Sequence, residues 1–325
     1  YKMEKIDILM ATYNGEKYLE EQIESILNQT YSNFRLIISD DCSTDRTCAI
    51  LKEYAQKDNR IELYFQEKNL GYVKNFEFLL GKVENELYML SDQDDYWLPE
   101  KVEKTYNKLI QENADMVFTD LIVVDEEEKI INKSFNELMN LKRKICKTVG
   151  TSELAYLYNC VTGCTIMGKK SNIKNIIPIP TYSKHVLHDH WIALANSING
   201  KVAYLSEGLI KYRQHGTNQI GIKHTMSKSN SVEEIRKHFI DVKLGVFGTY
   251  VNNPQIFTEK LRKRNEKAYK YFEMLAQKKN INFRGWGTFY NLYKNESVKY
   301  YMENFLILNM PCVVRLVLRK NKKGE

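Results

Sequence analysis

The first part of the chain alternates short apolar runs with segments whose apolar side chains recur every three or four positions. The apolar runs predict strands, which we place at Ile6–Ala11, Phe34–Ser39, Ile61–Phe65, Glu86–Leu90 and Asp115–Thr119. The helical spacing predicts helices, which we place at Glu16–Gln29, Ser43–Ala55, Gly71–Gly81 and Pro99–Glu112. Such alternation forms right-handed βαβ units, so we expect an α/β fold with a mainly parallel, Rossmann-like sheet and helices on both faces.

The pattern is looser after Thr119. Residues 125–147 are charged and are predicted to form an exposed excursion. Beyond them we place a buried strand at Val161–Met167, a helix from His185 to Asn196, strands at Val202–Leu205 and Leu209–Tyr212, and helices near Val232–Phe247 and Pro254–Gln277. We therefore expect one α/β domain over residues 1–220, with halves at about 5–120 and 121–220, and a mostly helical region over 221–325.

Polar clusters follow three of the predicted strands. They are Thr12-Tyr13-Asn14, Asp40-Asp41 and Asp92–Asp95. In open parallel sheets ligands bind beyond the carboxyl ends of the strands, so we expect a nucleotide at this edge. The chain has no G-x-G-x-x-G after its first strand and no G-x-x-x-x-G-K-[ST] anywhere, which argues against a dinucleotide dehydrogenase and a P-loop NTPase.

The segment Ser91–Trp97 carries three carboxylates within four residues, at the end of an apolar run. Carboxylates at a buried strand end are costly unless a positive group lies against them. A divalent cation with oxygen ligands, shared with a diphosphate, would offset this cost. The alternative is an acidic turn that caps the helix beginning near Pro99.

Net charge and the pattern of cysteines indicate the cellular compartment and the class of partner. The net charge of +7 is uneven, because residues 221–325 hold 21 Lys and Arg against 9 Asp and Glu, whereas residues 1–220 are mildly acidic. The six cysteines form no C-x-x-C pair, so we expect no zinc ribbon or redox site and a reducing, cytoplasmic setting. No nucleic-acid-binding motif is present, and we expect no nucleic-acid partner.

The basic tail, residues 281–325, is rich in aromatic side chains. Its apolar stretch Phe305–Leu318 is interrupted by Pro311 and Arg315 and is shorter than the roughly 20 residues of a spanning helix. Two readings stay open: a surface-lying amphipathic segment that gives peripheral contact with the inner face of the cell membrane, and ordinary helical packing.

The chain resembles the family 2 glycosyltransferases, which are inverting enzymes of the GT-A fold. The resemblance covers roughly residues 5–220. Five motifs in family order carry it: the strand and turn Ile8–Asn14, the nucleotide segment Asp40–Asp45, the N-x-G turn Asn69–Gly71, the D-x-D motif in Ser91–Trp97, and the pair His188–Trp191 and Tyr212–Asn218. The last pair is similar to the rhamnosyltransferase-type branch that builds bacterial surface polysaccharides.

The resemblance implies a role for each cluster. A nucleoside-diphosphate sugar linked to dTDP or UDP would be bound by Thr12, Tyr13, Asn14, Asp40, Asp41, Asn69, Gly71, Asp92, Gln93 and Arg213. Mn²⁺ or Mg²⁺ would be bound by Asp94 and Asp92, with His215 as a third ligand from far along the chain. Asp189 would be the base for the acceptor hydroxyl. Helix capping is the alternative for the aspartates, and a structural role is the alternative for His215.

The resemblance also implies a nucleotide-sugar half at about 5–120 and an acceptor half at about 121–220. The expected donor is dTDP-rhamnose or a UDP-hexose, and the acceptor is a saccharide that is often lipid-linked in this branch. A sugar nucleotidyltransferase and a non-catalytic scaffold remain as alternatives. The first would favour a glycine- and lysine-rich loop after the first strand, where this chain has only Gly15 and Lys17.

Overall fold

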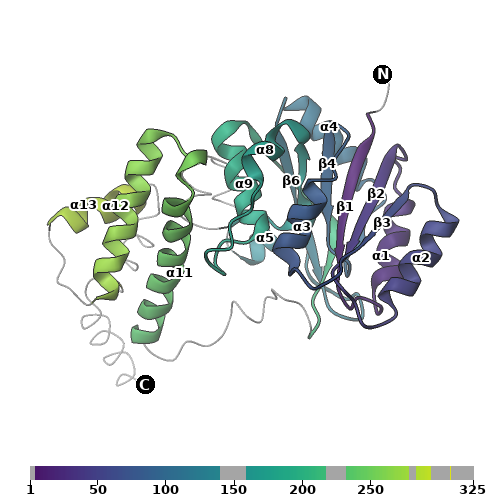
Figure 1. Cartoon of the computed structure of the whole chain (residues 1–325), viewed down its shortest axis with the longest axis horizontal. Helices are drawn as coiled ribbons and strands as arrows, with labels where there is room; N and C mark the ends of the chain where they lie inside the picture. The colour runs from purple at the N-terminus through teal and green to yellow at the C-terminus, as the bar shows by residue number, and fades with distance from the viewer. Residues whose placement is uncertain (1–3, 140–158, 217–231, 278–282, 294–307, 309–325) are drawn as a thin grey trace. The chain divides into compact units, whose positions relative to one another are not determined.

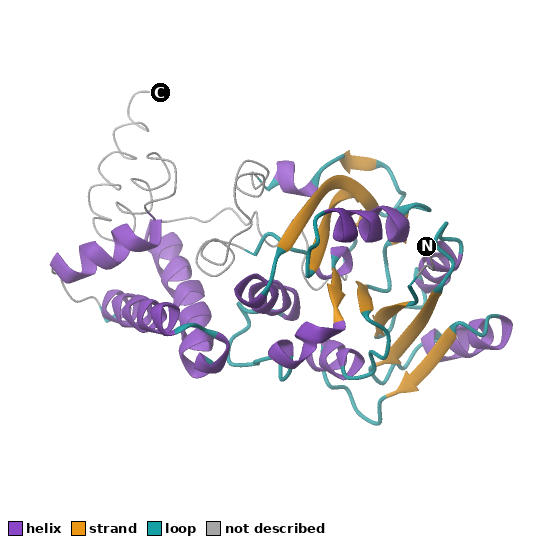
Figure 2. Ribbon diagram, turned by 90° about the horizontal axis from the view of Figure 1, so that it is seen from above, coloured by secondary structure: helices purple, strands orange, loops and turns teal. Residues whose placement is uncertain are grey.

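The computed structural model describes residues 4–139, 159–216, 232–277, 283–293 and 308. The chain forms two compact units. One comprises Tyr1–Ile179 and Leu187–Ile222, and the other comprises Pro180–Val186 and Lys223–Glu325. The first unit is built on a sheet, and the second is helical (Figures 1 and 2).

The sheet of the first unit has nine strands in the order β3-β2-β1-β4-β8-β6-β9-β5, with β7 paired to β6 (Figure 1). Its first four strands are parallel. They are β1 (Ile6–Thr12), β2 (Phe34–Asp40), β3 (Ile61–Phe65) and β4 (Leu87–Ser91), so the predicted N-terminal strands are confirmed. In this register Thr12 lies beside Asp40 and Met10 beside Ser91, which brings the polar strand ends to one edge.

The second half of the sheet differs from the prediction. The five remaining strands are β5 (Tyr96–Trp97), β6 (Met116–Val124), β7 (Ile130–Asn132), β8 (Met167–Lys169) and β9 (Val202–Arg213). The predicted strand Val161–Met167 is wrong: it contains the 3₁₀ helix η1 (Gly163–Thr165), and β8 begins only at its end. The two predicted strands after residue 202 are one strand, interrupted in its pairing with β6 by an irregularity near Asp120. The short strands β5 and β7 were not predicted.

The helices of the first unit cover both faces of the sheet (Figure 1). They are α1 (Leu19–Leu27), α2 (Thr47–Lys57), α3 (Tyr72–Leu80), α4 (Lys101–Gln111), α5 (Phe135–Leu138), α8 (Ile173–Ile176) and α9 (His188–Asn199), with the 3₁₀ helix η2 (Lys170–Asn172). Alternate residues of β1, Ile8 and Met10, share one core with Ile23 of α1 and Val102 of α4. On the other face, α3 contacts β1, β2 and α9. This arrangement confirms the α/β fold with helices on both faces.

The two tryptophans that flank the motifs serve packing. Trp97 has no exposed surface, and its backbone N–H donates to Ser25 Oγ at 3.0 Å. Trp191 is 1% exposed, and its indole N–H donates to the carbonyl of Ile176 at 2.8 Å. Neither indole is therefore placed to stack on a sugar in this structure.

The second unit consists of α11 (Val232–Asn252), η3 (Pro254–Ile256), α12 (Glu259–Ala276) and α13 (Phe283–Tyr293), together with the segment Pro180–Val186. Phe247 of α11 stacks on Phe272 of α12 at 5.8 Å. Among the helices that the structure describes, none is both long and apolar enough to span a membrane. Most of the predicted tail over 281–325 lies outside the described residues.

Candidate active site

Asp40 connects the ends of the first two strands. Its Oδ1 accepts a hydrogen bond from Thr12 Oγ1 at 2.9 Å, and it also accepts from the backbone N–H and the hydroxyl of Ser43. Asp40 and Thr12 are each 1% exposed. Both side chains are therefore buried at the ends of β1 and β2, where they are hydrogen-bonded to each other.

Asp41 holds the loop that follows β3. Its carboxylate accepts from the backbone N–H of Leu70 at 2.6 Å and of Gly71 at 2.8 Å. Gly71 has φ +79°, a left-handed conformation that glycine adopts without strain, and it begins α3. Asn69 is exposed and accepts from the same N–H at 3.0 Å. The structure thus brings the predicted residues Asp41, Asn69 and Gly71 together, because the side chains of the first two accept hydrogen bonds from the backbone N–H of the third.

The first loop is locked to the acidic motif through Gln93. Its Oε1 accepts from the N–H of Tyr13 at 2.8 Å, and its Nε2 donates to the carbonyl of Tyr13 at 3.0 Å. A Cβ on Gly15 would collide with this amide. Asn14 accepts from the N–H of Thr44 at 2.8 Å. Gln93 therefore fixes the backbone of Tyr13, a residue that is 42% exposed, in the loop after β1.

The acidic motif after β4 surrounds the thiol of Cys164. One potential ligand atom from each of Asp92, Asp95 and Cys164 lies within 4.8 Å of the others. Burial, together with the negative charge of Asp94, raises the pKa of Asp95 well above its usual value. The same causes and the charge of Asp189 raise the pKa of Asp92 to about 7. Negative charge is therefore concentrated here and unfavourable without a cation.

Asp94 and His215 meet at the exposed side of the motif. Oδ2 of Asp94 lies 2.9 Å from Nε2 of His215, which follows the end of β9. The ring of His215 also packs against Tyr18, with ring centroids 5.0 Å apart. The structure thus brings together two of the predicted metal ligands from distant parts of the chain.

The side chain of Arg213 is buried and forms ion pairs with acidic side chains. Its guanidinium is 4% exposed, pairs with Glu21 at 2.5 Å and Glu128 at 3.3 Å, and donates to the backbone carbonyl of Asp94 at 3.3 Å. Its backbone N–H donates to Asp95 Oδ1 at 3.3 Å. In this structure Arg213 therefore fixes the acidic motif against β9, and the predicted contact with a diphosphate would require these pairs to rearrange.

The carboxylates of the motif fit a hard divalent cation. Mn²⁺ and Mg²⁺ prefer oxygen ligands, and imidazole is a common addition. Burial raises the pKa of the Cys164 thiol well above its usual value, so the thiol stays protonated and serves as a hydrogen-bond donor to Asp95. Among the described residues, Asp92 and Asp95 offer oxygen atoms close together beside Cys164, and Asp94 of the same motif is paired with His215, so these are the groups that could hold such a cation.

Asp189 lies in the first turn of α9 and is 8% exposed. Its Oδ1 accepts from the N–H of His190 at 2.6 Å, and its carboxylate also accepts from the side chain of Asn159. Burial raises its pKa to about 6. Its charge acts on Asp92 and also raises the pKa of Tyr72. Asp189 therefore lies near enough to the acidic motif for its charge to act on Asp92.

Two residues of this centre were missed in the sequence. Cys164 falls inside the predicted strand Val161–Met167 and has no predicted role, and Asn159 is not singled out. Both lie in the Asn-Cys-Val-Thr-Gly-Cys stretch, whose polar residues break an apolar run, and this was the available signal. Only the packing of η1 against β4 shows that the stretch contacts the aspartates.

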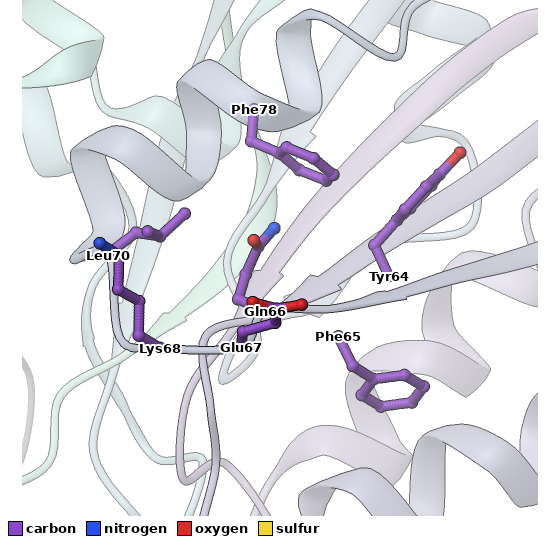
Figure 3. Close-up of a pocket in the computed structure, with 7 residues that line it drawn as sticks. All are labelled: Tyr64, Phe65, Gln66, Glu67, Lys68, Leu70 and Phe78. Carbon is purple, nitrogen blue, oxygen red and sulfur yellow. The ribbon is translucent and has the colours of Figure 1, made fainter.

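A separate groove lies at the outer edge of the sheet (Figure 3). It has a volume of about 480 Å³ and is lined by Tyr64, Phe65, Gln66, Glu67, Lys68, Leu70 and Phe78. None of the clustered aspartates lines it. Leu70 belongs both to this groove and to the turn held by Asp41. The groove therefore lies beside that turn and is distinct from the acidic motif.

The comparisons with known proteins identify the family. The profile of "Glycosyl transferase family 2" matches residues 7–177, which is more than half of the chain. The chain therefore belongs to glycosyl transferase family 2, and it is a glycosyltransferase by class. The family predicted from the motifs is confirmed.

The curated relatives are mostly bacterial. The O-antigen biosynthesis glycosyltransferase WbnJ of Escherichia coli is 29% identical over 72% of this chain and 90% of its own. The dTDP-rhamnosyl transferase RfbG of Shigella flexneri is 30% identical over 65% and 73%. The glucosyltransferase WfgD of Escherichia coli, named for UDP-Glc and a diphosphoundecaprenol acceptor, is 24% identical over 77% and 87%. These relatives support a glycosyltransferase of bacterial surface-polysaccharide synthesis.

Solved structures share the fold at low identity. S. aureus TarS 1-349 in complex with UDP-GlcNAc superposes with a TM-score of 0.57 at 18% identity, covering 94% of this chain and 81% of that one. The match to a longer TarS chain covers 43% of the length of that chain. The mannosyltransferase PcManGT of Pyrobaculum calidifontis, in complex with GDP-Man and Mn²⁺, gives 0.55 at 15% identity, covering 94% and 81%. This similarity confirms the GT-A fold.

Proposed function

We propose that the chain transfers a sugar from a nucleoside-diphosphate sugar to a saccharide acceptor, with inversion and with the help of a divalent cation. The observation that carries the proposal is that Asp189 of α9 lies near enough to Asp92 for its charge to add to burial and to the charge of Asp94 in raising the pKa of Asp92. A base on one side and a cation-binding motif on the other is the arrangement that a single inverting displacement needs.

The donor would lie along the edge formed by the first four strands. Tyr13, Asn14 and Asn69 are its exposed side chains and are proposed to contact the nucleoside. Thr12, Asp40, Asp41, Gly71 and Gln93 hold these groups in place through the hydrogen bonds described above. Asp92 would bind between the ribose and the cation.

Mn²⁺ or Mg²⁺ would be held by Asp92, Asp94 and His215. When bound, the cation neutralises the charge that develops on the departing diphosphate. Arg213 would hold this motif in place, because its guanidinium donates to the backbone carbonyl of Asp94 and its backbone N–H donates to the carboxylate of buried Asp95.

Asp189 is proposed to accept the proton of the acceptor hydroxyl. The acceptor oxygen then forms a bond to the anomeric carbon on the face opposite the diphosphate, and the bond between that carbon and the diphosphate oxygen breaks. The electron pair leaves with the nucleoside diphosphate, so the configuration inverts. A carboxylate whose pKa is about 6 stays mostly ionised at neutral pH and is more basic than an exposed aspartate.

The names of the relatives support the donor class that we propose. RfbG is named for dTDP-rhamnose and WfgD for UDP-glucose, and we favour dTDP-rhamnose because the His188–Trp191 block resembles the rhamnosyltransferase branch. A thermal-shift panel with Mn²⁺ and dTDP-rhamnose, UDP-glucose, UDP-galactose or UDP-N-acetylglucosamine would identify it, since a ligand that binds only the folded state raises the melting midpoint. Release of nucleoside diphosphate that depends on acceptor addition would establish transfer and would contradict a nucleotidyltransferase or a scaffold.

The basic tail is proposed to bring the enzyme to an anionic membrane that carries a lipid-linked acceptor. Within the basic residues 221–325, this tail of residues 281–325 holds 8 Lys and Arg against 3 Glu. Flotation with vesicles containing anionic lipid, compared between the whole chain and a truncation after residue 280, tests this. Equal flotation of the two proteins would contradict the proposal.

A further inference from the structure

The ring of Tyr18 lies against basic side chains at the start of α1. The ζ-carbon of Arg213 lies 4.7 Å from the centre of this ring, and the ring of His215 packs against it with centroids 5.0 Å apart and planes inclined at 39°. Nζ of Lys17 lies 4.7 Å from the same centre. The face of an aromatic ring carries negative charge, so the contacts with Arg213 and Lys17 are favourable.

Two of these side chains also contact Asp94 of the acidic motif. Nε of Arg213 donates to the backbone carbonyl of Asp94 at 3.3 Å, and Nε2 of His215 lies 2.9 Å from Oδ2 of the same residue. A single aromatic ring therefore contacts both of the side chains by which the end of β9 reaches Asp94.

The backbone of Tyr18 is fixed, so its ring has a defined starting point. Its N–H donates to the carbonyl of Gly15 at 3.1 Å, and its carbonyl accepts from the N–H of Gln22, also at 3.1 Å. Glu21, three positions later, lies near Tyr18 on the helix surface and pairs with the guanidinium of Arg213 at 2.5 Å. The start of α1 thus presents an aromatic ring and a carboxylate to the end of β9.

The aromatic face of Tyr18 matters more for these contacts than its hydroxyl. The hydroxyl donates to Oε2 of Glu126 at 3.4 Å, which is long for a hydrogen bond between oxygen atoms. The same oxygen pairs with Lys17 at 2.9 Å, so Glu126 keeps a partner when the hydroxyl is removed. Phenylalanine would therefore preserve the contacts with Arg213 and His215, whereas leucine would remove the aromatic face and keep an apolar side chain.

We propose that Tyr18 is a positioning residue of the cation site, whose ring holds the imidazole of His215 against Asp94. The proposal rests on the proposed function, in which these two side chains ligate Mn²⁺ or Mg²⁺. An imidazole that is already oriented loses less freedom when it binds a metal, and removal of such a supporting partner costs about 10- to 100-fold in metal affinity. In this role Tyr18 acts through His215 and not on the substrate.

Three substitutions separate positioning from packing. Tyr18→Leu removes the ring, and Tyr18→Phe keeps it. Tyr106→Leu is the matched control, because Tyr106 is also half-buried and its ring packs on that of Tyr31 with centroids 5.4 Å apart. The hydroxyl of Tyr31 donates to the carbonyl of Glu4, before β1, so this pair lies at the opposite end of the strands from Asp94. Melting midpoints show which variants fold, and Tyr18→Met serves if Tyr18→Leu does not.

The first measurement needs neither metal nor substrate. In protein labelled with ¹⁵N-histidine, the ring nitrogens of His215 are assigned by their absence in His215→Gln, and their shifts at a fixed pH report the hydrogen bond of Nε2. We expect the Nε2 shift in Tyr18→Leu to move towards its value in Asp94→Ala, where the partner is absent. Tyr18→Phe and Tyr106→Leu should keep the native value. A native shift in Tyr18→Leu would overturn the proposal, whatever the enzyme's substrate.

The second measurement is the affinity for Mn²⁺, alone and with dTDP or UDP, from the loss of the free ion's EPR signal as protein is added. We expect Tyr18→Leu to bind Mn²⁺ about 10- to 100-fold more weakly than the native protein, and Tyr18→Phe and Tyr106→Leu to bind it with native affinity. Native affinity in Tyr18→Leu, or an equal loss in Tyr106→Leu, would make Tyr18 merely structural. Failure of the native protein to bind Mn²⁺ under any of these conditions would instead remove the cation from the proposed function.

Discussion

Oδ2 of Asp94 lies 2.9 Å from Nε2 of His215, although 121 positions separate the two residues in the chain. The contact closes the acidic motif after β4 with a residue that follows β9, the strand that also pairs with β5. These two side chains, which are hydrogen-bonded to each other in this structure, are the pair that we propose as ligands of the cation.

Replacement of Asp94 tests the cation directly. We expect Asp94→Ala to weaken Mn²⁺ binding by more than the roughly 10- to 100-fold lost when a supporting partner of a ligand is removed. Donor binding should become independent of Mn²⁺. Calorimetry with and without EDTA measures both, and Asp241→Ala, an exposed aspartate of the other unit, is the control. Mn²⁺-dependent donor binding of native strength in Asp94→Ala would refute the assignment.

Replacement of Asp189 tests the base. Asp189→Asn keeps the size of the side chain but cannot accept the proton, so we expect transfer to fall by about 10²- to 10⁴-fold while donor affinity is nearly unchanged. In the native enzyme the rate should fall as the pH drops through about 6, because the carboxyl group then becomes protonated. Turnover close to native in Asp189→Asn would exclude this role.

The pH dependence of stability should reveal the strain in the acidic motif. The pKa of Asp92 is raised from its usual value of 3.8 to about 7 in the folded state. Between these two pH values the folded protein therefore binds more protons than the unfolded chain does. Stability from this group is therefore complete below about pH 4 and is lost as the pH rises through 7. We expect Asp92→Asn to raise the melting midpoint at pH 8 by a few degrees without metal, and an unchanged or lower midpoint would contradict the prediction.

Gly15 provides a test of the donor edge. A side chain there collides with the Gln93 amide that holds Tyr13, so we expect Gly15→Ala to raise the donor KM while the acceptor KM changes little. Gly287→Ala is the control, because a Cβ at this exposed helical position meets nothing. The control should stabilise α13 by about 1 kcal/mol, the difference between glycine and alanine in a helix. Equal donor KM values in both variants would leave Gln93 without this role.

The sequence determined the first half of the fold because its strands are short apolar runs joined by amphipathic helices. These local patterns are enough to predict β1 to β4 and the parallel sheet that gathers Thr12, Asp40 and Asp92 at one edge. The apolar stretch from Val161 was misread because a buried 3₁₀ turn and a buried strand have the same hydrophobicity. Periodicity cannot separate them over so few residues.

The tertiary structure decided what each polar residue does. The sequence placed Asp40, Asp41, Gln93 and Arg213 beside the donor, but the structure engages their side chains in holding loops. It also added Asn159 and Cys164, which no motif marked. Composition and spacing fix which groups are available near a strand end, whereas hydrogen-bond partners depend on contacts between segments that lie far apart in the chain, and these exist only after folding.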